Sequence, residues 1–429
     1  MTTIFAQATA AGKAGVAVIR ISGPDAFAAA KLVVGTVPEP GRFALRSFRN
    51  AQGEVLDSGL VLSFAAPHSF TGEDVVELQC HGSSAIMTAM LAAISETGLA
   101  RMAEPGEFSR RALMNNRMDL AQLEGLGDLI EAETEAQRKQ AQRVFAGALT
   151  EVTERWRADL LRALALLEVT IDFADEEVPV DVVPEVVGLI IGVTTDIRRE
   201  VAGSFAAERV RDGFEVAIIG APNVGKSTLL NHIAGRDAAI VSSLAGTTRD
   251  VIEVQLNLQG VPVVFLDTAG MRETDDEIER IGVDRAIQRA QSADIRLFLL
   301  ETTEDKPVVE IQSDDIVRVG KDDDAHAEGR GISGKTGAGV ERVLGEIHAI
   351  LSRRVAGVGV AISERHRSAM KAAMGALESA LVEVEAGPER VELAAENMRA
   401  AVRALDVLMG RLDVEDVLGE IFSRFCLGK

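Results

Sequence analysis

The stretch Phe214-Glu-Val-Ala-Ile-Ile-Gly-Ala-Pro-Asn-Val-Gly-Lys-Ser227 decides how the region around it folds. Its apolar run from Val216 to Ile219 predicts a buried strand. The residues from Gly220 to Ser227 fit the phosphate-loop pattern G-x4-G-K-[ST], in which glycines turn backbone N–H groups toward a phosphate. The Lys reaches the outer phosphates, the Ser hydroxyl can hold Mg²⁺, and the next helix points its positive end at the anion. A glycine-rich turn without a ligand is disfavoured by the strand before it and the helix after it.

Two further motifs follow at ordinary spacing. Asp267-Thr-Ala-Gly270 comes after the apolar run Val263–Leu266, so its Asp can hold Mg²⁺ through water and Gly270 can contact a γ-phosphate. Upstream, Gly246-Thr-Thr-Arg-Asp250 supplies Thr248 as a second candidate Mg²⁺ ligand beside Ser227. Alone, the two threonines would be read as a turn. Together and in this order, the three motifs predict a switch GTPase.

The base-reading motif of such enzymes, Asn-Lys-x-Asp, is matched only in part. Lys321 and Asp323 fit, but Gly320 replaces the Asn. The Asp carboxylate can pair with the guanine N1–H and amino group, so we expect guanine selectivity with one amide contribution missing. Ser333-Gly-Lys335 resembles the final base-contacting loop.

The residue after Gly270 is Met271, where Ras-like enzymes carry a Gln that orients the attacking water. Arg249 and Arg272 are the candidates for an arginine finger, and neither is an obvious donor. Hydrolysis therefore needs another polar group and another source of positive charge.

Composition bounds the rest of the chain. A chain of 429 residues with 47% hydrophobic content predicts two or three domains. The two cysteines, Cys80 and Cys426, are far apart and form no disulfide framework, which favours a reducing compartment. No signal-like N-terminus or long apolar run is present, so we expect a soluble cytoplasmic protein without membrane contact.

The charge is unevenly distributed. The net charge is −21, which argues against free-standing nucleic-acid binding. Residues 1–119 hold 10 Lys and Arg against 11 Asp and Glu, a net of −1, so the remainder carries −20. A polyanion would meet the N-terminal part or arrive with a basic partner.

We predict a multidomain protein. Residues 1–119 form an α+β domain, residues 120–211 with 355–429 a helical domain, and residues 212–354 an inserted α/β domain with a mainly parallel, doubly wound sheet. Because helical character brackets the α/β part, one interrupted helical domain is the economical reading, although periodicity leaves two separate helical domains open. We expect a loop near 173–184, and Trp156 on a core-facing stripe with Leu160, Leu164 and Leu167.

Finer patterns concern the first domain. Alternation predicts strands at 15–21, 59–64 and 74–79, and a helix from Ser83 to Glu96. Two polar stretches, 69–74 with 77–82 and 104–111 with 115–119, are interpreted by composition as turns and helix caps. In the α/β part we expect strands at 251–258, 261–266 and 295–300 and a helix at 340–352.

Several motifs together resemble the MnmE (TrmE) family of bacterial tRNA-modification GTPases, across essentially the whole chain. The matching stretches are Ala6-Gln-Ala-Thr9, Gly15-Val16, Arg20-Ile-Ser-Gly23, Ser69-Phe-Thr-Gly-Glu-Asp74, Glu77-Leu-Gln79 with His81-Gly82, Pro105-Gly-Glu-Phe108, Asp119-Leu-Ala-Gln122 and the C-terminal Ile421-Phe-Ser-Arg-Phe-Cys-Leu-Gly-Lys429. The last stretch is highly specific.

For the N-terminal domain, the resemblance implies binding of 5-formyl- or 5,10-methylene-tetrahydrofolate, the one-carbon donor. By matched position, Arg20, Glu77 and Lys429 would contact the folate. Arg117 stands where the family usually has Lys, which keeps the charge but changes the geometry. Cys426 matches the family's C-terminal Cys and is a possible functional residue, whereas Cys80 receives no role.

For the G domain, the resemblance implies K⁺ in the role of an arginine finger, held by Asn223, Ser242, Leu244 and Thr247. Glu279 would position the water in place of the missing Gln, which makes it the candidate catalytic residue. The contacts to GTP, with Mg²⁺ on Ser227 and Thr248, would then be Asn223, Val224, Gly225, Lys226, Ser227, Thr228, Ser242, Ser243, Leu244, Ala245, Gly246, Thr247, Thr248, Asp267, Thr268, Ala269, Gly270, Lys321, Asp323, Ser333, Gly334 and Lys335.

The resemblance further implies a homodimer whose GTP-bound G domains pair, and a partner, the FAD-dependent flavoprotein MnmG (GidA), in a heterotetramer or larger complex. The chemistry would install an aminomethyl or carboxymethylaminomethyl group at C5 of the wobble uridine (U34) of tRNA. Two alternatives remain at this stage. A ribosome-assembly or signalling GTPase would leave the N-terminal domain and the C-terminal motif unexplained, and a nucleotide-binding scaffold with weak turnover is kept open by Gly320.

Overall fold

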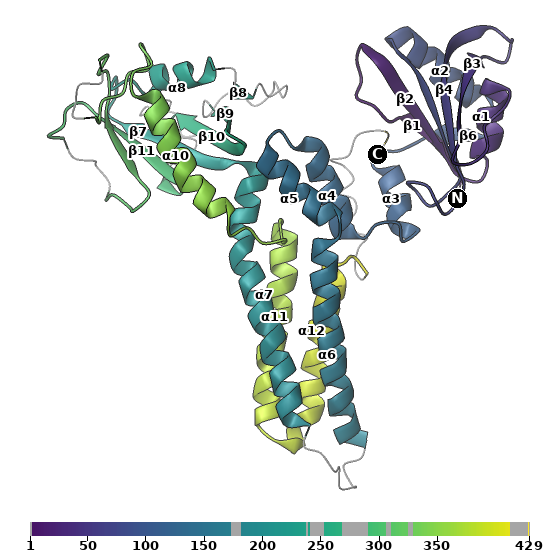
Figure 1. The fold of residues 1–429 in the computed structure, drawn as a ribbon. Helices are drawn as coiled ribbons and strands as arrows, with labels where there is room; N and C mark the ends of the chain where they lie inside the picture. The colour runs from purple at the N-terminus through teal and green to yellow at the C-terminus, as the bar shows by residue number, and fades with distance from the viewer. Residues whose placement is uncertain are drawn as a thin grey trace, which may run out of the picture. The chain divides into compact units, whose positions relative to one another are not determined.

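The structure, a computed structural model, describes residues 2–172, 182–236, 239–240, 253–267, 291–305, 310–324, 329–411 and 428. The chain divides into two compact units, Met1–Gly127 with Leu405–Lys429, and Asp128–Ala404. Within the described ranges, each helix is too short or too polar to cross a membrane. The architecture is multidomain and mixes two sheets with long helices, as predicted (Figure 1).

The first unit is built on a six-stranded sheet in the order β3-β4-β5-β2-β1-β6. Its neighbours are antiparallel except for β1 and β6, which run parallel. The three strands predicted from alternation are confirmed as β2, β4 and β5, with somewhat wider bounds. The strands are β1 (Thr3–Gln7), β2 (Ala14–Ser22), β3 (Phe43–Arg49), β4 (Val55–Phe64), β5 (Val75–Gly82) and β6 (Ala100–Met102).

Helices α1 (Ala26–Val34) and α2 (Ser84–Glu96) cover one face of this sheet (Figure 1). Their small and apolar residues share one buried cluster with inward-facing residues of the strands, because successive strand residues point to opposite faces. The predicted start of α2 is confirmed, since the Ser83 hydroxyl accepts a hydrogen bond from the Ile86 N–H at 3.2 Å. Two short helices follow in the chain, α3 (Glu107–Met114) and α4 (Leu120–Glu131).

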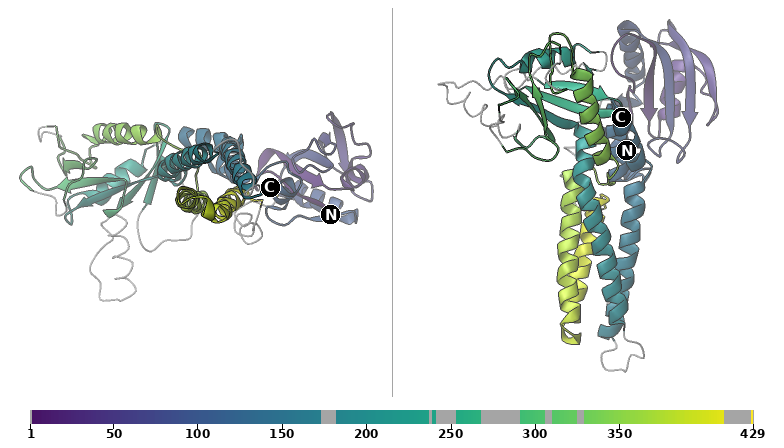
Figure 2. Two further views of the ribbon diagram at one scale, coloured as in Figure 1. Left: turned by 90° about the horizontal axis from the view of Figure 1, so that it is seen from below. Right: turned by 60° about the vertical axis from the view of Figure 1, so that its left-hand side comes forward.

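The second unit begins with helices. α6, α7, α11 and α12 run side by side as a bundle in both views of Figure 2. The predicted apolar stripe is confirmed, because Trp156, Leu160, Leu164 and Leu167 are buried on α6. Most of the loop expected near 173–184 lies outside the described residues. The helical elements are α5 (Glu135–Phe145), α6 (Ala148–Asp172), α7 (Val183–Asp212), α11 (Glu364–Glu385), η2 (Pro388–Arg390) and α12 (Val391–Leu408).

The same unit contains a second six-stranded sheet in the order β12-β11-β7-β10-β9-β8. The four strands from β12 to β10 are parallel, and β9 and β8 are antiparallel at one side, so the mainly parallel sheet is confirmed. α8 and α10 pack on one face through a single apolar cluster. The elements are β7 (Phe214–Gly220), α8 (Lys226–Ala234), β8 (Ala239–Ile240), β9 (Glu253–Leu258), β10 (Val261–Asp267), β11 (Ile295–Leu300), β12 (Ile316–Val319) and α10 (Val340–Val355).

The α/β part is connected to the bundle at both ends of its chain. α7 leads into β7 through Gly213, which has φ of 98°. After α10, the backbone N–H of Val360 donates to the Glu200 carboxylate of α7 at 3.0 Å. At the turn between β9 and β10, the carbonyl of Gly260 accepts from the N–H of Ala136 in α5 at 2.9 Å. The α/β part is therefore inserted between α7 and α11 in the chain and packs against α5.

Candidate functional site

The phosphate loop joins β7 to α8 at the carboxyl edge of the parallel strands. Asn223 and Gly225 have left-handed backbone conformations, with φ of 64° and 109°, which bend the loop sharply. The Lys226 side chain is buried, and its Nζ donates to the carbonyl oxygens of Gly220 at 2.8 Å and Ala221 at 2.9 Å. The ammonium group is thus held directly over the loop, at the positive end of α8.

Asp267 ends β10 next to this loop. Parallel pairing sets it opposite Ile218 of β7, so its carboxylate and the loop share one edge of the sheet. Asp267 is 3% exposed. Burial lowers the pKa of Lys226, and the negative charge of Asp267 acts in the opposite direction. The pair places a buried carboxylate close to a buried ammonium group at the point where the motifs predict phosphate and Mg²⁺.

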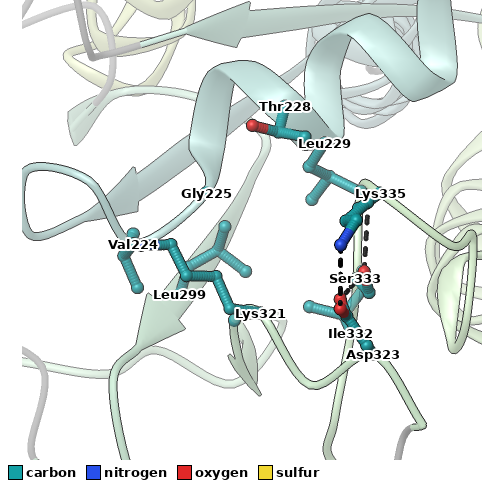
Figure 3. A pocket seen from close by; sticks show the side chains of 12 residues that line it. Val224, Gly225, Thr228, Leu229, Leu299, Lys321, Asp323, Ile332, Ser333 and Lys335 are labelled. Atoms are coloured by element: carbon teal, nitrogen blue, oxygen red, sulfur yellow. Dashed lines mark hydrogen bonds and ion pairs between the residues drawn. The ribbon is translucent and has the colours of Figure 1, made fainter.

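A cavity of about 250 Å³ opens beside the phosphate loop (Figure 3). The loops that follow β12 and precede α10 form its other wall. Its lining contains five residues predicted to read the base, and the phosphate-loop side adds Val224, Gly225 and Thr228. The lining residues are Val224, Gly225, Thr228, Leu229, Leu299, Gly320, Lys321, Asp323, Ile332, Ser333, Gly334 and Lys335.

Asp323 is oriented by Ser333 in this cavity. The buried Ser333 Oγ donates to Asp323 Oδ1 at 2.7 Å, and it accepts from the backbone N–H groups of Lys335 and Thr336 at 3.1 and 3.2 Å. The Lys335 Nζ lies 3.7 Å from the other carboxylate oxygen, as the dashed lines in Figure 3 indicate. A carboxylate fixed in this way can present acceptors to adjacent N–H groups of a planar ligand.

The structure brings together one part of the residues predicted for the nucleotide site. The phosphate loop, Asp267 and the two base-reading loops lie at one edge of the sheet. The other part lies outside the described residues, namely Ser242, Ser243, Leu244, Ala245, Gly246, Thr247, Thr248, Thr268, Ala269, Gly270 and Glu279, with Cys426 and Lys429 in the C-terminal segment.

The first unit contains a second cavity, of about 350 Å³, at the carboxyl end of β4 and the start of β5. Its lining residues are Phe64, His68, Ser69, Phe70, Val75, Glu77 and Arg117. Two of the four residues predicted to contact folate, Glu77 and Arg117, are among them. The Arg20 guanidinium joins them by donating to Glu77 from the neighbouring strand at 2.9 Å and by lying over the Phe70 ring at 4.6 Å.

Gly428 approaches the same sheet from the end of the chain. A Cβ at this position would collide with the backbone of Gln7 and Ala8, at the end of β1. The Ala6 that precedes them is paired with Arg20 across β1 and β2. Within the first unit, the penultimate residue therefore lies close to the strand that carries Arg20.

Sequence reasoning missed a buried ion cluster beside this cavity. Arg111 is 3% exposed, and its guanidinium contacts Glu73 at 3.0 Å and Glu107 at 2.9 Å. Arg101 donates two further hydrogen bonds to Glu107, at 2.6 and 2.8 Å. Glu107 also accepts from the Glu104 N–H at 3.0 Å in the turn before α3, so the interpretation of this stretch as turns and caps left out the ion pairs of Glu107 and Arg111. The sequence feature that could have indicated this ion cluster is the high density of charged residues around Phe108, which is buried.

The pKa of Glu107 reflects this cluster. Burial raises it, but hydrogen bonds from Arg101, the Glu104 backbone N–H and Arg111 outweigh burial and lower the pKa to about 2. Glu107 is therefore ionised throughout the neutral range, and its charge holds the start of α3 against the sheet.

Comparison with known protein families decides the identity of the chain. The family described as "MnmE helical domain" matches residues 120–426. The chain belongs to the MnmE family. The family described as "GTP-binding protein TrmE N-terminus" matches residues 3–117. Both matches agree with the resemblance found in the motifs.

Full-length relatives support the same MnmE assignment. Proteins named tRNA modification GTPase MnmE from Roseobacter denitrificans and Jannaschia sp. are each 56% identical to this chain over 429 residues, covering 100% of both chains. The protein of the same name from Paracoccus denitrificans is 46% identical over the same coverage. Among solved structures, Aquifex aeolicus Era bound to GDP and AlF₄⁻ matches 38% of this chain and 66% of its own, with 26% identity and a TM-score of 0.25, too low to support an inference.

Proposed function

We propose that this MnmE-family chain hydrolyses GTP in the modification of tRNA. The observation that carries the proposal is the continuous site formed by the phosphate loop and the Asp323–Ser333 pair around one cavity. Full-length relatives that are named tRNA modification GTPases support the biological role.

The nucleotide would lie along the carboxyl edge of the second sheet. Its phosphates would meet the loop and Lys226, and its guanine would enter the cavity that holds Asp323. The Ser227 hydroxyl at the start of α8 and the Asp267 carboxylate are hard oxygen donors of the kind that Mg²⁺ prefers. When bound, Mg²⁺ would neutralise charge on the phosphates, and Thr248 is proposed as its second protein ligand.

We also propose the finer features that the family resemblance implies for turnover. K⁺ would be held by Asn223, Ser242, Leu244 and Thr247, and Glu279 would orient water. Asn223 lies in the phosphate loop with φ of 64°, and its exposed side chain supports such a role. Pairing of two G domains in a homodimer would complete the site.

The cavity of the first unit is the proposed folate site. It combines aromatic rings, Phe64 and Phe70, with Glu77 and Arg117, so it can stack on a flat heterocycle and pair with its polar edge. The ligand would be 5-formyl- or 5,10-methylene-tetrahydrofolate. Arg20 would act mainly through Glu77, because it donates to that carboxylate.

The proposed partners are tRNA and the flavoprotein MnmG with its FAD, in the cytoplasm. The net charge of the chain is −21, which supports a proposal in which a basic partner contributes to binding the tRNA phosphates. The product would be an aminomethyl or carboxymethylaminomethyl group at C5 of the wobble uridine. Measured binding of a tetrahydrofolate would separate this function from that of a general signalling GTPase.

The test is GTP hydrolysis by the purified chain in KCl and in NaCl at equal ionic strength, with ATP as the control nucleotide. We expect turnover of GTP over ATP and strong stimulation by K⁺. Equal rates in the two salts would overturn the K⁺ site. Absence of turnover in both, even with tRNA and MnmG added, would overturn the proposed hydrolase.

Glu279→Ala tests the water-positioning role in the same assay. The variant should bind GTP as the parent chain does and lose most of its turnover. A loss of binding equal to the loss of turnover would contradict that role.

A further inference from the structure

Gly320, which stands in place of the Asn of the base-reading motif, has no room for a Cβ in this structure. Gly320 directly follows β12, and its N–H donates to the Leu300 carbonyl of β11 at 2.9 Å. A Cβ built on Gly320 would lie well under 3.0 Å from the carbonyl oxygen of Val224 and 3.2 Å from Val224 Cγ2. The base-reading loop and the phosphate loop therefore meet through their backbones at this point.

Moving the phosphate loop away from Gly320 would cost free energy. Val224 is 2% exposed and lies between Asn223 and Gly225, which both have left-handed backbone conformations. A shift of its carbonyl would have to change the backbone of Asn223, which already holds an uncommon left-handed conformation, or move the buried Val224 side chain. On the other side, the N–H of Gly320 is tied to β11.

Of two neighbouring positions, Gly334 shows an equally close approach, whereas the contact of Lys321 with Gly225 is an ordinary van der Waals one. Lys321 follows with φ of 58°, and its Cγ lies within 3.6 Å of where a Gly225 Cβ would stand. Gly334, in the second base-reading loop, has no room for a Cβ because the backbone of Thr228 and Leu229 occupies that space. Gly320 and Gly334 thus let both base-reading loops pack directly on the phosphate loop and α8.

We propose that Gly320 is a specificity-determining residue: it sets the spacing between the phosphate loop and Asp323 through a backbone contact, in place of an Asn side chain. This proposal rests on the guanine-nucleotide binding proposed above. Guanine selectivity then depends on Asp323 standing at the right distance from the phosphates, with Ser333 holding its orientation. Restoring the motif by Gly320→Asn should weaken the site, because the new side chain must push the two loops apart.

The test measures equilibrium binding of fluorescently labelled GDP and ADP to the full-length chain. Gly320→Ala should weaken GDP binding by about tenfold, the size expected for forcing one extra carbon into a packed site. ADP binding should change little, since phosphate contacts carry it, so the selectivity ratio should fall by a similar factor. Gly320→Asn should weaken GDP binding at least as much.

Gly345→Ala is the matched control, because this α10 glycine has nothing within 4 Å of its Cβ position. It should leave both affinities within about twofold, as expected of a surface substitution. Tighter GDP binding by Gly320→Asn would overturn the proposal, since the glycine would then be a lost contact. GDP affinity unchanged in Gly320→Ala would overturn it equally.

Asp323→Asn provides a readout that does not require a side chain at position 320. It should shift preference from guanosine diphosphate toward xanthosine diphosphate, because the amide replaces one of the two carboxylate acceptors with an N–H donor, which can pair with the 2-carbonyl of xanthine but not with the 2-amino group of guanine. Unchanged GDP affinity would place the base reader elsewhere and overturn the role of Gly320. If the unmodified chain shows no preference for GDP over ADP, the proposed GTPase function itself fails, which is a separate result.

Discussion

The nucleotide site and the first unit's cavity are built in different ways. Around the phosphate loop, positions are set mainly by backbone, through left-handed residues at Asn223 and Gly225 and glycine contacts at Gly320 and Gly334. Around the first cavity, positions are set by charged side chains from segments distant in sequence, such as Arg20 with Glu77. The difference teaches where each site is vulnerable. The nucleotide site is therefore sensitive to added atoms, and the cavity of the first unit is sensitive to the loss of charged groups.

Substitution of Lys226 should have the largest effect on nucleotide binding. Its charged side chain is part of a site whose other positions are set mainly by the backbone. Its Nζ makes two hydrogen bonds to loop carbonyls at 2.8 and 2.9 Å. Lys226→Ala should weaken GTP binding by about 1,000-fold, corresponding to ~4 kcal/mol from charge-assisted hydrogen bonds and phosphate contact. Equilibrium nucleotide titration measures it.

Lys139→Ala on α5 is the control for Lys226, since its exposed ammonium pairs only with Glu135 at 3.4 Å among the contacts the structure describes. It should leave GTP affinity unchanged. A Lys226 effect as small as that of Lys139 would mean that the loop binds phosphate through backbone alone.

Glu107→Gln should have the next largest effect, a loss of local stability in the first unit. Removing the charge leaves the buried Arg111 guanidinium with one charged partner, Glu73, and the Thr2 carbonyl among the described residues, and should lower the opening free energy of α3 and β5 by about 3 kcal/mol. Hydrogen exchange followed by mass spectrometry reads these segments separately. Glu104→Gln, whose side chain is 69% exposed, should leave exchange unchanged.

The pH dependence of that effect follows from the lowered pKa of Glu107. The carboxyl has a pKa of about 2 in the fold against an ordinary value of 4.5, so its contribution is complete above 4.5 and is lost as the pH falls toward 2. The difference between parent and Glu107→Gln should be constant from pH 7 to 5 and shrink below that. A difference that grows on acidification would contradict the ion cluster.

Glu77→Gln should have a smaller effect, limited to ligand binding in the cavity of the first unit. It removes the carboxylate that pairs with Arg20 and should weaken binding of 5-formyl-tetrahydrofolate by about tenfold, equivalent to ~1.4 kcal/mol. Isothermal titration calorimetry measures it, with the exposed Glu96→Gln as the control. Equal affinities for the parent and Glu77→Gln would remove Glu77 from the proposed folate site.

Arg117→Lys should have the smallest effect, a loss of about threefold in folate affinity. The positive charge remains, and only the planar geometry of the guanidinium is lost. The same titration measures it. A larger loss than that of Glu77→Gln would show that Arg117, rather than Glu77, dominates the cavity.

Much of the nucleotide site could be predicted from the sequence because its residues are contiguous. The pattern from Gly220 to Ser227 contains its own strand end, turn and helix start, so local chemistry dictates the geometry. The parallel sheet then places Asp267 and Asp323 at the same edge, as expected for strands that share a direction. The grouping of these residues around one cavity was therefore foreseeable, apart from the lack of room for a Cβ at Gly320.

The buried ion cluster was not foreseeable, since composition does not tell which charges turn inward. Glu73 and Arg111 meet only because a loop between β4 and β5 folds against α3. A charged segment is normally solvated, and only pairing allows it to be buried. The edge strands β3 and β6 were not anticipated either, because edge strands take their stability from a single partner strand.

By itself, the sequence determined the strand–loop–helix of the phosphate site, the order of its motifs and the membership of the family, because these depend on residues adjacent in the chain. Tertiary structure alone decided that Gly320 touches the Val224 carbonyl and that Arg111 is buried between Glu73 and Glu107. The Gly320–Val224 and Arg111–Glu73 contacts join residues far apart in the sequence, whereas Glu107 and Arg111 are four residues apart on α3. Their energies depend on distance and burial, which exist only once the sheets and helices have packed.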